Sequence, residues 1–274
     1  MRKDSPRHYV LDKIRSMLYG GTLELDIIGT EETMNSITRE KILKRFEEVY
    51  CPSNLVLTVV GDCDFDYVVN WAEENFENRN GVVPEYEVPE KNEISEEMRK
   101  GIDQANMVFA VHAPLVNDPK VYAAEVLATY MAGGMSSKLF SEIREKRNLV
   151  YSIHGDLDAD KKYSYILIYA GAEPQNVPEI KKVILEEFEK ASKELTEEAL
   201  VEIKEQLIGN HQISMEDSQG QMVQLLINEL DTKAEDFYEY EKFISDVKLE
   251  DVKELASKVK EGSYSFFALI PEKK

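Results

Sequence analysis

The stretch from Ala132 to Ser152 constrains the fold of this chain more than any other segment. It begins with the pair Gly133-Gly134, continues through an amphipathic segment with a basic end, and reaches a strand that opens at Tyr151. Adjacent glycines favour a tight turn because glycine adopts left-handed backbone angles without strain. The stretch therefore predicts a glycine turn after a helix, then a short helix and a β-strand in immediate succession.

The pattern around this stretch alternates between strands and helices. The expected strands are apolar runs that share β-branched residues, at 104–112, 150–156, 163–170 and 263–270, with a hairpin turn at 158–161. Apolar residues at helical spacing predict helices at 119–131, 178–195, 196–216, 219–230, 234–245 and 249–260. Residues 95–274 therefore form a complete α+β half with a mixed or antiparallel sheet.

Residues 1–80 repeat part of this order. Helices are predicted at 7–18, at 41–50 after the N-cap Thr38, and at 65–76. The run 55–60 is continuously apolar or β-branched, which is typical of a strand buried on both faces. Residues 78–93 lose periodicity, so we predict a linker at 81–94. The fold class predicted is α+β, with two related layers of sheet, helices packed on one face of each, and the first layer incomplete.

Composition excludes some classes of partner and compartment. The net charge of −20 repels phosphate backbones, which argues against nucleic acid and anionic membranes as partners. No apolar run approaches the ~18 residues of a membrane span, and residues 1–6 lack the apolar core of a signal peptide. Cys51 and Cys63 form no CxxC motif, which favours a reduced compartment. The sequence therefore predicts a cytoplasmic location.

Four ordered motifs resemble the M16 zinc metallopeptidases, the pitrilysin-like family that includes mitochondrial processing peptidase. Residues 132–152 are similar to the signature of the second half of those enzymes, and the other three motifs lie at 28–38, 50–62 and 169–177. Lys138 stands where arginine is common, and Asn148 where glycine is common. Asparagine tolerates left-handed angles better than other non-glycine residues, so the turn at Asn148 is expected to survive.

The resemblance implies a zinc site that this sequence does not contain. M16 enzymes bind zinc with an inverted H-x-x-E-H helix and a later glutamate. The histidines here are His8, His112, His154 and His211, and no two lie within five residues. We interpret them as structural or surface residues, and we expect no catalytic or metal-binding residue in this chain. The zinc of the intact protein is expected upstream of Met1, so this chain alone is expected to be inactive.

The resemblance assigns substrate contacts to Arg144 and Tyr151. Tyr151 would donate a hydrogen bond to the peptide carbonyl at the scissile bond, and Arg144 would bind the peptide chain beside it. Without the family, the same residues are a half-buried strand aromatic and a solvated helix charge. The expected partner is a peptide that adds a strand to a sheet edge, with a homodimer also possible for the parent enzyme. The alternative function is a non-catalytic scaffold or partner subunit of the same fold.

Overall fold

The computed structural model describes residues 5–76, 80–82 and 85–272, and these form two compact units. We call the first the sheet unit; it contains the residues up to Glu24, Val88–Gly209, and those from Tyr240 onward. We call the second the helical unit; it contains Leu25–Glu87 and Asn210–Glu239. The predicted boundary at 81–94 stays a prediction, and its residues 83–84 lie outside the described residues.

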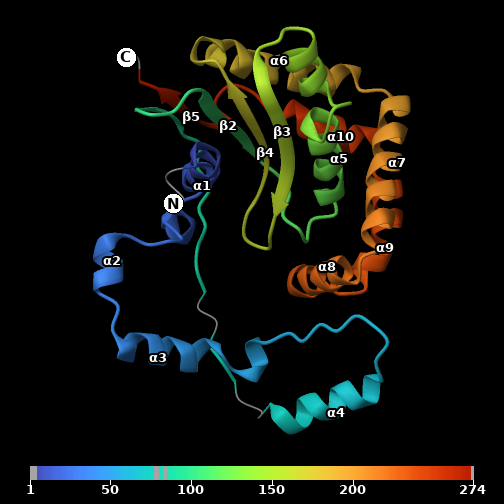
Figure 1. The fold of residues 1–274 in the computed structure, drawn as a ribbon. Helices are drawn as coiled ribbons and strands as arrows, with labels where there is room; N and C mark the ends of the chain where they lie inside the picture. Colours follow the sequence, from blue (N-terminus) through green and yellow to red (C-terminus); the bar gives the residue numbers. More distant parts are fainter. Residues whose placement is uncertain (1–4, 77–79, 83–84, 273–274) are drawn as a thin grey trace. The chain divides into compact units, whose positions relative to one another are not determined.

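The sheet unit is built on a five-stranded mixed sheet with the order β1-β5-β2-β4-β3 (Figure 1). Its strands are β1 (Ile94–Arg99), β2 (Ala105–His112), β3 (Val150–Ala159), β4 (Ser164–Ala172) and β5 (Ser265–Pro271). β1 runs parallel to β5, and the other neighbours are antiparallel. The predicted α+β class is confirmed, and four of the five strands match predicted ranges. The sequence missed β1, because three of its six residues are charged.

The main core lies between the sheet and three helices, α5 (Val121–Ala132), α6 (Val177–Glu194) and α10 (Leu249–Ser257). Phe109 of β2 is completely buried there, and its ring stacks on Tyr264 and Phe188 with centroids 4.6 and 6.2 Å apart. All three helices lie at predicted ranges. Their apolar residues recur at helical spacing because one stripe of each helix faces this core.

A further helix, α1 (Pro6–Leu18), packs against β2 and β5 and belongs to a second cluster of buried residues. Its residues Val10, Ile14 and Leu18 are completely buried with Phe267 and Leu269 of β5. The prediction of the helix is confirmed, but its placement with the sheet unit was not foreseen. The alternate residues of β2 and β5 belong to the two different clusters, so α1 covers the face of the sheet opposite α5, α6 and α10, and the expectation of helices on one face is corrected.

The hairpin of β3 and β4 differs from the predicted turn at 158–161. β3 continues to Ala159, and the turn closes with the Asp160 amide donating to the Tyr163 carbonyl at 2.8 Å. The extension is stabilised by Asp158, whose carboxylate accepts the Tyr165 hydroxyl at 2.6 Å and pairs with Arg15 at 3.1 Å. Asp158, which was predicted to lie in the turn, is therefore part of β3.

The helical unit contains α2 (Glu31–Asn35), α3 (Arg39–Val49), α4 (Phe65–Asn75) and α8 (Ser218–Asp231). Two further helices, α7 (Glu197–Ser214) and α9 (Asp236–Asp246), contribute residues to both units. Short turns complete the chain: η2 (Gly21–Glu24), η3 (Pro52–Asn54), η4 (Phe140–Glu145) and η5 (Pro174–Asn176). The predicted cap of α3 is confirmed, because the Thr38 hydroxyl accepts the Lys41 amide at 3.3 Å.

The strand predicted at residues 55–60 is wrong. The segment has no regular secondary structure, and Leu55, Leu57 and Val59 are 47, 55 and 48% exposed. A strand needs a neighbour that satisfies its backbone hydrogen bonds. The described residues of the helical unit contain no other strand, so this segment has nothing to pair with. Apolar composition alone does not form a strand.

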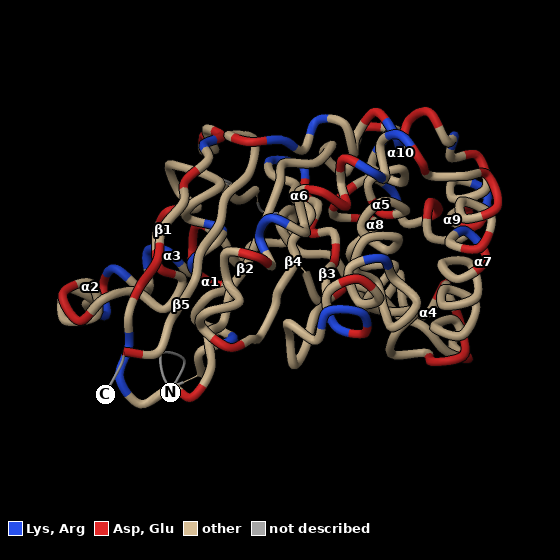
Figure 2. The backbone as a smooth tube through the Cα atoms, turned by 90° about the horizontal axis from the view of Figure 1, so that it is seen from above, with Lys and Arg blue, Asp and Glu red and all other residues tan. Residues whose placement is uncertain are grey.

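Acidic and basic residues are interspersed along the same helices, with acidic residues in the majority (Figure 2). Several pairs are spaced by one helical turn, such as Lys146 with Glu142 at 2.5 Å and Lys258 with Glu254 at 2.8 Å. Among the described residues, no helix is both long enough and apolar enough to span a membrane. This charge pattern is typical of helix faces that are exposed to solvent.

Candidate functional site

The two residues assigned to substrate contact lie on consecutive elements of the sheet unit. Arg144 is in η4, a π-helical turn, and Tyr151 is the second residue of β3. Leu139 and Ile143 anchor η4 because both side chains are completely buried. Between the two elements, Asn148 adopts a left-handed φ of 53°, as expected from its place in the turn. The turn therefore connects η4 directly to β3.

Arg144 is exposed and rests on its own helical turn. Its guanidinium carbon lies 4.9 Å from the centre of the Phe140 ring, a cation–π contact that holds the side chain on this surface. The described residues offer Arg144 no ion pair. Its planar fork of N–H donors is therefore available to a carbonyl or carboxylate group.

Tyr151 is 57% exposed, and its hydroxyl donates to the Glu173 Oε1 atom at 3.2 Å. Desolvation raises the pKa of Tyr151, and the negative charge of Glu173 raises it further. Glu173 follows the end of β4, and its Oε2 atom accepts the side-chain amide of Gln175. The carboxylate is thus held by two neutral donors.

Sequence reasoning missed Glu173. Its signal was a carboxylate at the end of a strand, inside the matched motif at 169–177, directly before Pro174. The consequence for Tyr151 is chemical. A phenol has one proton to donate, and in this structure that proton is directed at Glu173. The predicted donation to a peptide carbonyl therefore requires the hydroxyl to leave Glu173.

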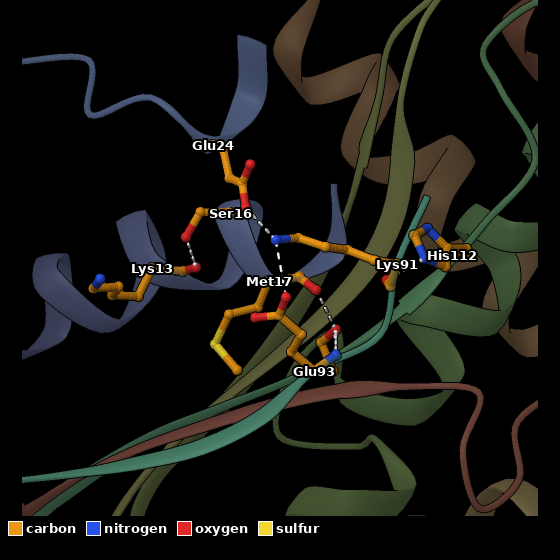
Figure 3. Close-up of polar contacts among 8 residues, drawn as sticks. Lys13, Ser16, Met17, Glu24, Lys91, Glu93 and His112 are labelled. Carbon is orange, nitrogen blue, oxygen red and sulfur yellow. Dashed lines mark hydrogen bonds and ion pairs between the residues drawn. The ribbon is translucent and has the colours of Figure 1, made fainter. Parts of the chain in front are cut away.

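A second group of polar residues surrounds Lys91 (Figure 3). The Lys91 ammonium pairs with Glu24 at 2.5 Å and with Glu93 at 2.9 Å, and the hydrogen bond to Glu24 is the main cause of its raised pKa. The Lys91 carbonyl lies 3.0 Å from the His112 Nε2 atom, and its amide donates to the Leu18 carbonyl at 2.8 Å. These contacts link segments that are far apart in the sequence.

This polar group is an anchor for α1 rather than a reactive site. Just after α1, Tyr19 forms an antiparallel bridge with Glu90, and the Gly20 amide donates to Pro89 at 2.8 Å. The buried Tyr19 hydroxyl donates to the Ser164 carbonyl at 2.7 Å. These hydrogen bonds join the residues that follow α1 to the sheet unit.

The histidines are separate from one another, as their spacing indicated. The His8 Nδ1 atom lies 2.9 Å from the Ser5 hydroxyl, the His112 ring packs edge-on to Tyr19, and the His211 ring packs edge-on to Phe237. His154 is exposed on β3. No group of three or more His, Cys, Asp or Glu residues that could hold a metal occurs among the described residues. The donor set of the described chain therefore does not fit a zinc site.

A sequence model of the family described as "Peptidase M16 inactive domain" matches residues 36–207. An uncharacterized zinc protease of Streptomyces coelicolor is 26% identical over 242 residues, which make up 84% of this chain and 53% of that protein. Other relatives in Rickettsia felis and Bacillus subtilis are also named uncharacterized zinc proteases, and this chain covers 51 and 57% of them. The chain thus spans about half the length of the relatives it matches.

Solved structures share the fold. A protease from Helicobacter pylori superposes with a TM-score of 0.87 at 20% identity, over 98% of this chain and 68% of that chain. A chain of complex III2 from Candida albicans gives a TM-score of 0.86 at 22% identity, over 97% of this chain and 67% of that chain. The family model covers more than half of the chain and includes both Arg144 and Tyr151. On this evidence the chain belongs to the M16 peptidase family.

Proposed function

We propose that this chain is the substrate-binding portion of a zinc-dependent endopeptidase that acts on peptides. The observation that carries the proposal is the match to relatives named zinc proteases over about half of their length. The described residues do not fit a zinc site, so the proposal places the zinc ligands in a part of the protein outside these 274 residues. This chain alone is then catalytically incomplete, and we place the intact enzyme in the cytoplasm.

The exposure of Arg144 and Tyr151 supports a role in peptide binding. Both side chains are exposed on the surface of the sheet unit, Arg144 in η4 and Tyr151 near the start of the outermost strand β3. A guanidinium fork and a phenolic hydroxyl are suited to the carbonyl oxygens of a peptide backbone.

The helical unit exposes apolar side chains, which supports the proposal that another segment of the protein packs against it. Its exposed apolar side chains include Phe46, Leu57, Phe65 and Trp71, which are 53, 55, 76 and 43% exposed. Clusters of exposed large apolar residues indicate a surface that another segment covers. We propose that this segment is the zinc-binding part of the same protein.

Zinc-dependent cleavage of a quenched fluorescent peptide tests the proposal. The protein extended upstream to the full length of its relatives should cleave the peptide, lose activity with a chelator, and regain it with zinc. In that protein, Tyr151→Phe should lower turnover by about 10- to 1000-fold if its hydroxyl serves the developing oxyanion. Arg144→Lys should also lower turnover because it replaces a fork by a point charge. No metal-dependent cleavage by the extended protein would overturn the proposal.

The second candidate is a non-catalytic partner subunit. It is favoured by one observation: the same fold occurs in a chain of complex III2 from Candida albicans. The same assay separates the two functions. A subunit without chemistry predicts no zinc-dependent cleavage by the extended protein.

A further inference from the structure

Tyr151 lies at an irregularity in the pairing of β3 with β4. Val150 pairs with Ala172, and the next pair along the ladder is Ser152 with Gly171. Two residues of β3 thus stand opposite one residue of β4, which is a β-bulge with Tyr151 as its extra residue. Bulges bend a strand, change the direction of a side chain and are frequent beside active sites. The ladder alone therefore does not fix the direction of Tyr151, and other contacts have to hold this part of the chain.

Three polar contacts join alternate residues around the bulge to the segment that follows β4. They are the Tyr151 hydroxyl with Glu173 at 3.2 Å, the Leu149 carbonyl with the Asn176 Nδ2 atom at 3.0 Å, and the Arg147 guanidinium with Glu179 at 3.4 Å. Two of these contacts hold flexible side chains. The contact of Asn176 holds a backbone carbonyl, so it fixes the chain itself.

The side chain of Asn176 is not needed for its own helix. Asn176 belongs to the motif at 169–177 and occupies the N-cap position of α6, where asparagine usually accepts a backbone amide of the first turn. Among the described residues its side chain makes no such capping bond. The start of α6 is anchored by Val177 and Ile180, which are 2 and 0% exposed in the main core. The amide group of Asn176 therefore serves the chain before β3 instead of α6.

The backbone of Leu149 connects the two residues proposed to bind a peptide. Its amide donates to the carbonyl of Ile143 at 2.9 Å, and Ile143 directly precedes Arg144 in η4. Its carbonyl accepts the Asn176 side chain, and Tyr151 follows two residues later. Leu149 is thus held on both sides, between the turn that carries Arg144 and the bulge that carries Tyr151. Loss of the Asn176 bond would free the chain between these two residues.

We propose that Asn176 is a positioning residue: through the Leu149 carbonyl it fixes the bulge, and so it sets the direction of the Tyr151 hydroxyl relative to Arg144. The inference rests on the proposed function, because Tyr151 and Arg144 are the peptide contacts proposed there. Asn176 acts through the backbone and does not itself touch the peptide. Such a residue matters because a displacement of about 1 Å can lower turnover by ~100-fold.

Two substitutions separate this role from helix capping. Asn176→Asp keeps a good N-cap residue and adds a charge that favours a helix N-terminus, so α6 should keep its stability. A carboxylate has no proton to donate to the Leu149 carbonyl, so the bond that holds the bulge is lost. Asn176→Ala removes the same donor without adding a charge. An effect that both variants share therefore comes from loss of the donor.

NMR spectra of the ¹³C,¹⁵N-labelled chain test the geometry without any catalysis. Both variants should shift the carbonyl ¹³C signal of Leu149 and the amide signals of Val150 and Tyr151, because the carbonyl loses its donor. In Asn176→Ala the pKa of Tyr151 should also fall. Besides desolvation, the charge of Glu173 raises that pKa, and the charge acts less on a hydroxyl that is no longer held beside it.

A matched control is available in α8. The Asn228 Nδ2 atom donates to the Gln224 carbonyl at 2.9 Å within that helix. Asn228→Asp removes the same kind of hydrogen bond and adds the same charge, but it should leave the Leu149 and Tyr151 signals unchanged.

Kinetics of the extended, zinc-dependent protein give a second measurement. Both Asn176 variants should lower kcat by about 10- to 100-fold with a smaller change in KM, because the direction of the Tyr151 hydroxyl matters most in the transition state. In a protein that already carries Tyr151→Phe, the same substitutions should lower kcat by a smaller factor, since residues that act together are not additive.

Three results would overturn the inference. They are unchanged Leu149 and Tyr151 signals in both Asn176 variants, equal shifts of these signals in Asn228→Asp, and a loss of kcat that is the same with and without the Tyr151 hydroxyl. No cleavage by the extended protein would instead overturn the proposed function. In that case the NMR spectra still decide whether Asn176 holds the bulge, so the two failures are distinguished.

Discussion

The sheet unit and the helical unit contain similar apolar runs, but only the run in the sheet unit is buried. In the sheet unit, β2 has hydrogen-bonded neighbours on both sides, and Val108 and Phe109 are completely buried. In the helical unit, Leu57 and Val59 belong to an equally apolar run and are about half exposed. The difference is the presence of paired strands in the first case. An apolar run becomes a core strand only when other strands supply its hydrogen bonds.

The two units also differ in the kind of side chain that they expose. The sheet unit has a buried core, and it exposes the polar side chains of Arg144, Tyr151 and Glu173 near the start of β3 and the end of β4. The helical unit exposes apolar side chains instead, which suit contact with another segment of protein. We therefore expect substitutions to affect stability mainly in the sheet unit.

The largest expected effect comes from removing one phenylalanine ring in each unit and comparing the losses of stability. Phe109→Ala removes a completely buried ring that stacks on two others, and it should lower the free energy of unfolding by about 3–5 kcal/mol. Phe46→Ala removes a ring that is 53% exposed, so it should lower that free energy by less than about 1 kcal/mol. Urea denaturation measures both variants. Equal losses would show that the helical unit has a core of its own.

The fold was predictable where local signals agreed with packing. Thr38 marks the start of α3, and the stripe of Val10, Ile14 and Leu18 marks the buried face of α1. The prediction failed where the outcome depends on neighbours. β1 carries Glu96 and Glu97 and has no apolar alternation, but it becomes a strand because β5 lies beside it. The run 55–60 has the opposite combination of strong local signal and no partner.

A smaller effect concerns carboxyl groups in the two units. Burial raises the pKa of Glu125 in α5 to about 7, although the Tyr240 hydroxyl donates to it at 2.6 Å; the charge of Asp156 raises it further. In the unfolded chain the pKa of Glu125 is near its ordinary value. Protonated Glu125 therefore contributes fully to the free energy of unfolding below pH ~4, and this contribution is lost as the pH rises to about 7. Glu125→Gln should therefore stabilise the chain at pH 8 by up to ~3 kcal/mol, and much less at pH ~4.

The check is the difference in unfolding free energy between variant and unmodified chain across this pH range. The helical unit provides a control in Glu40, whose pKa is lowered mainly by a hydrogen bond from its own backbone amide. A lowered pKa has the opposite sign, so Glu40→Gln should cause no stabilisation as the pH rises. A pH-independent difference for Glu125→Gln would show that the Glu125 carboxyl does not titrate between pH ~4 and ~7.

The candidate site was only partly predictable. Arg144 and Tyr151 were identified from the resemblance, and both side chains are exposed, but their contact with substrate stays a prediction. Glu173 was missed because its relation to Tyr151 depends on the packing of β3 beside β4, which brings together residues 22 positions apart. A contact of this kind has no local pattern in the sequence.

The smallest expected effect concerns a left-handed turn in each unit. In the helical unit this conformation belongs to a glycine, Gly29 with φ 76°, whereas in the sheet unit it belongs to Asn148 with φ 53°. Asn148→Gly should raise the free energy of unfolding by no more than about 0.5 kcal/mol, because relief of backbone strain exceeds the added freedom of the unfolded chain only slightly. Asn148→Ala should lower it by about 1 kcal/mol, because alanine adopts a positive φ less readily than asparagine does. Thermal denaturation of the pair resolves the sign. The same sign for both variants would mean that the turn into β3 is held by its anchors Leu139 and Ile143, whatever residue occupies position 148.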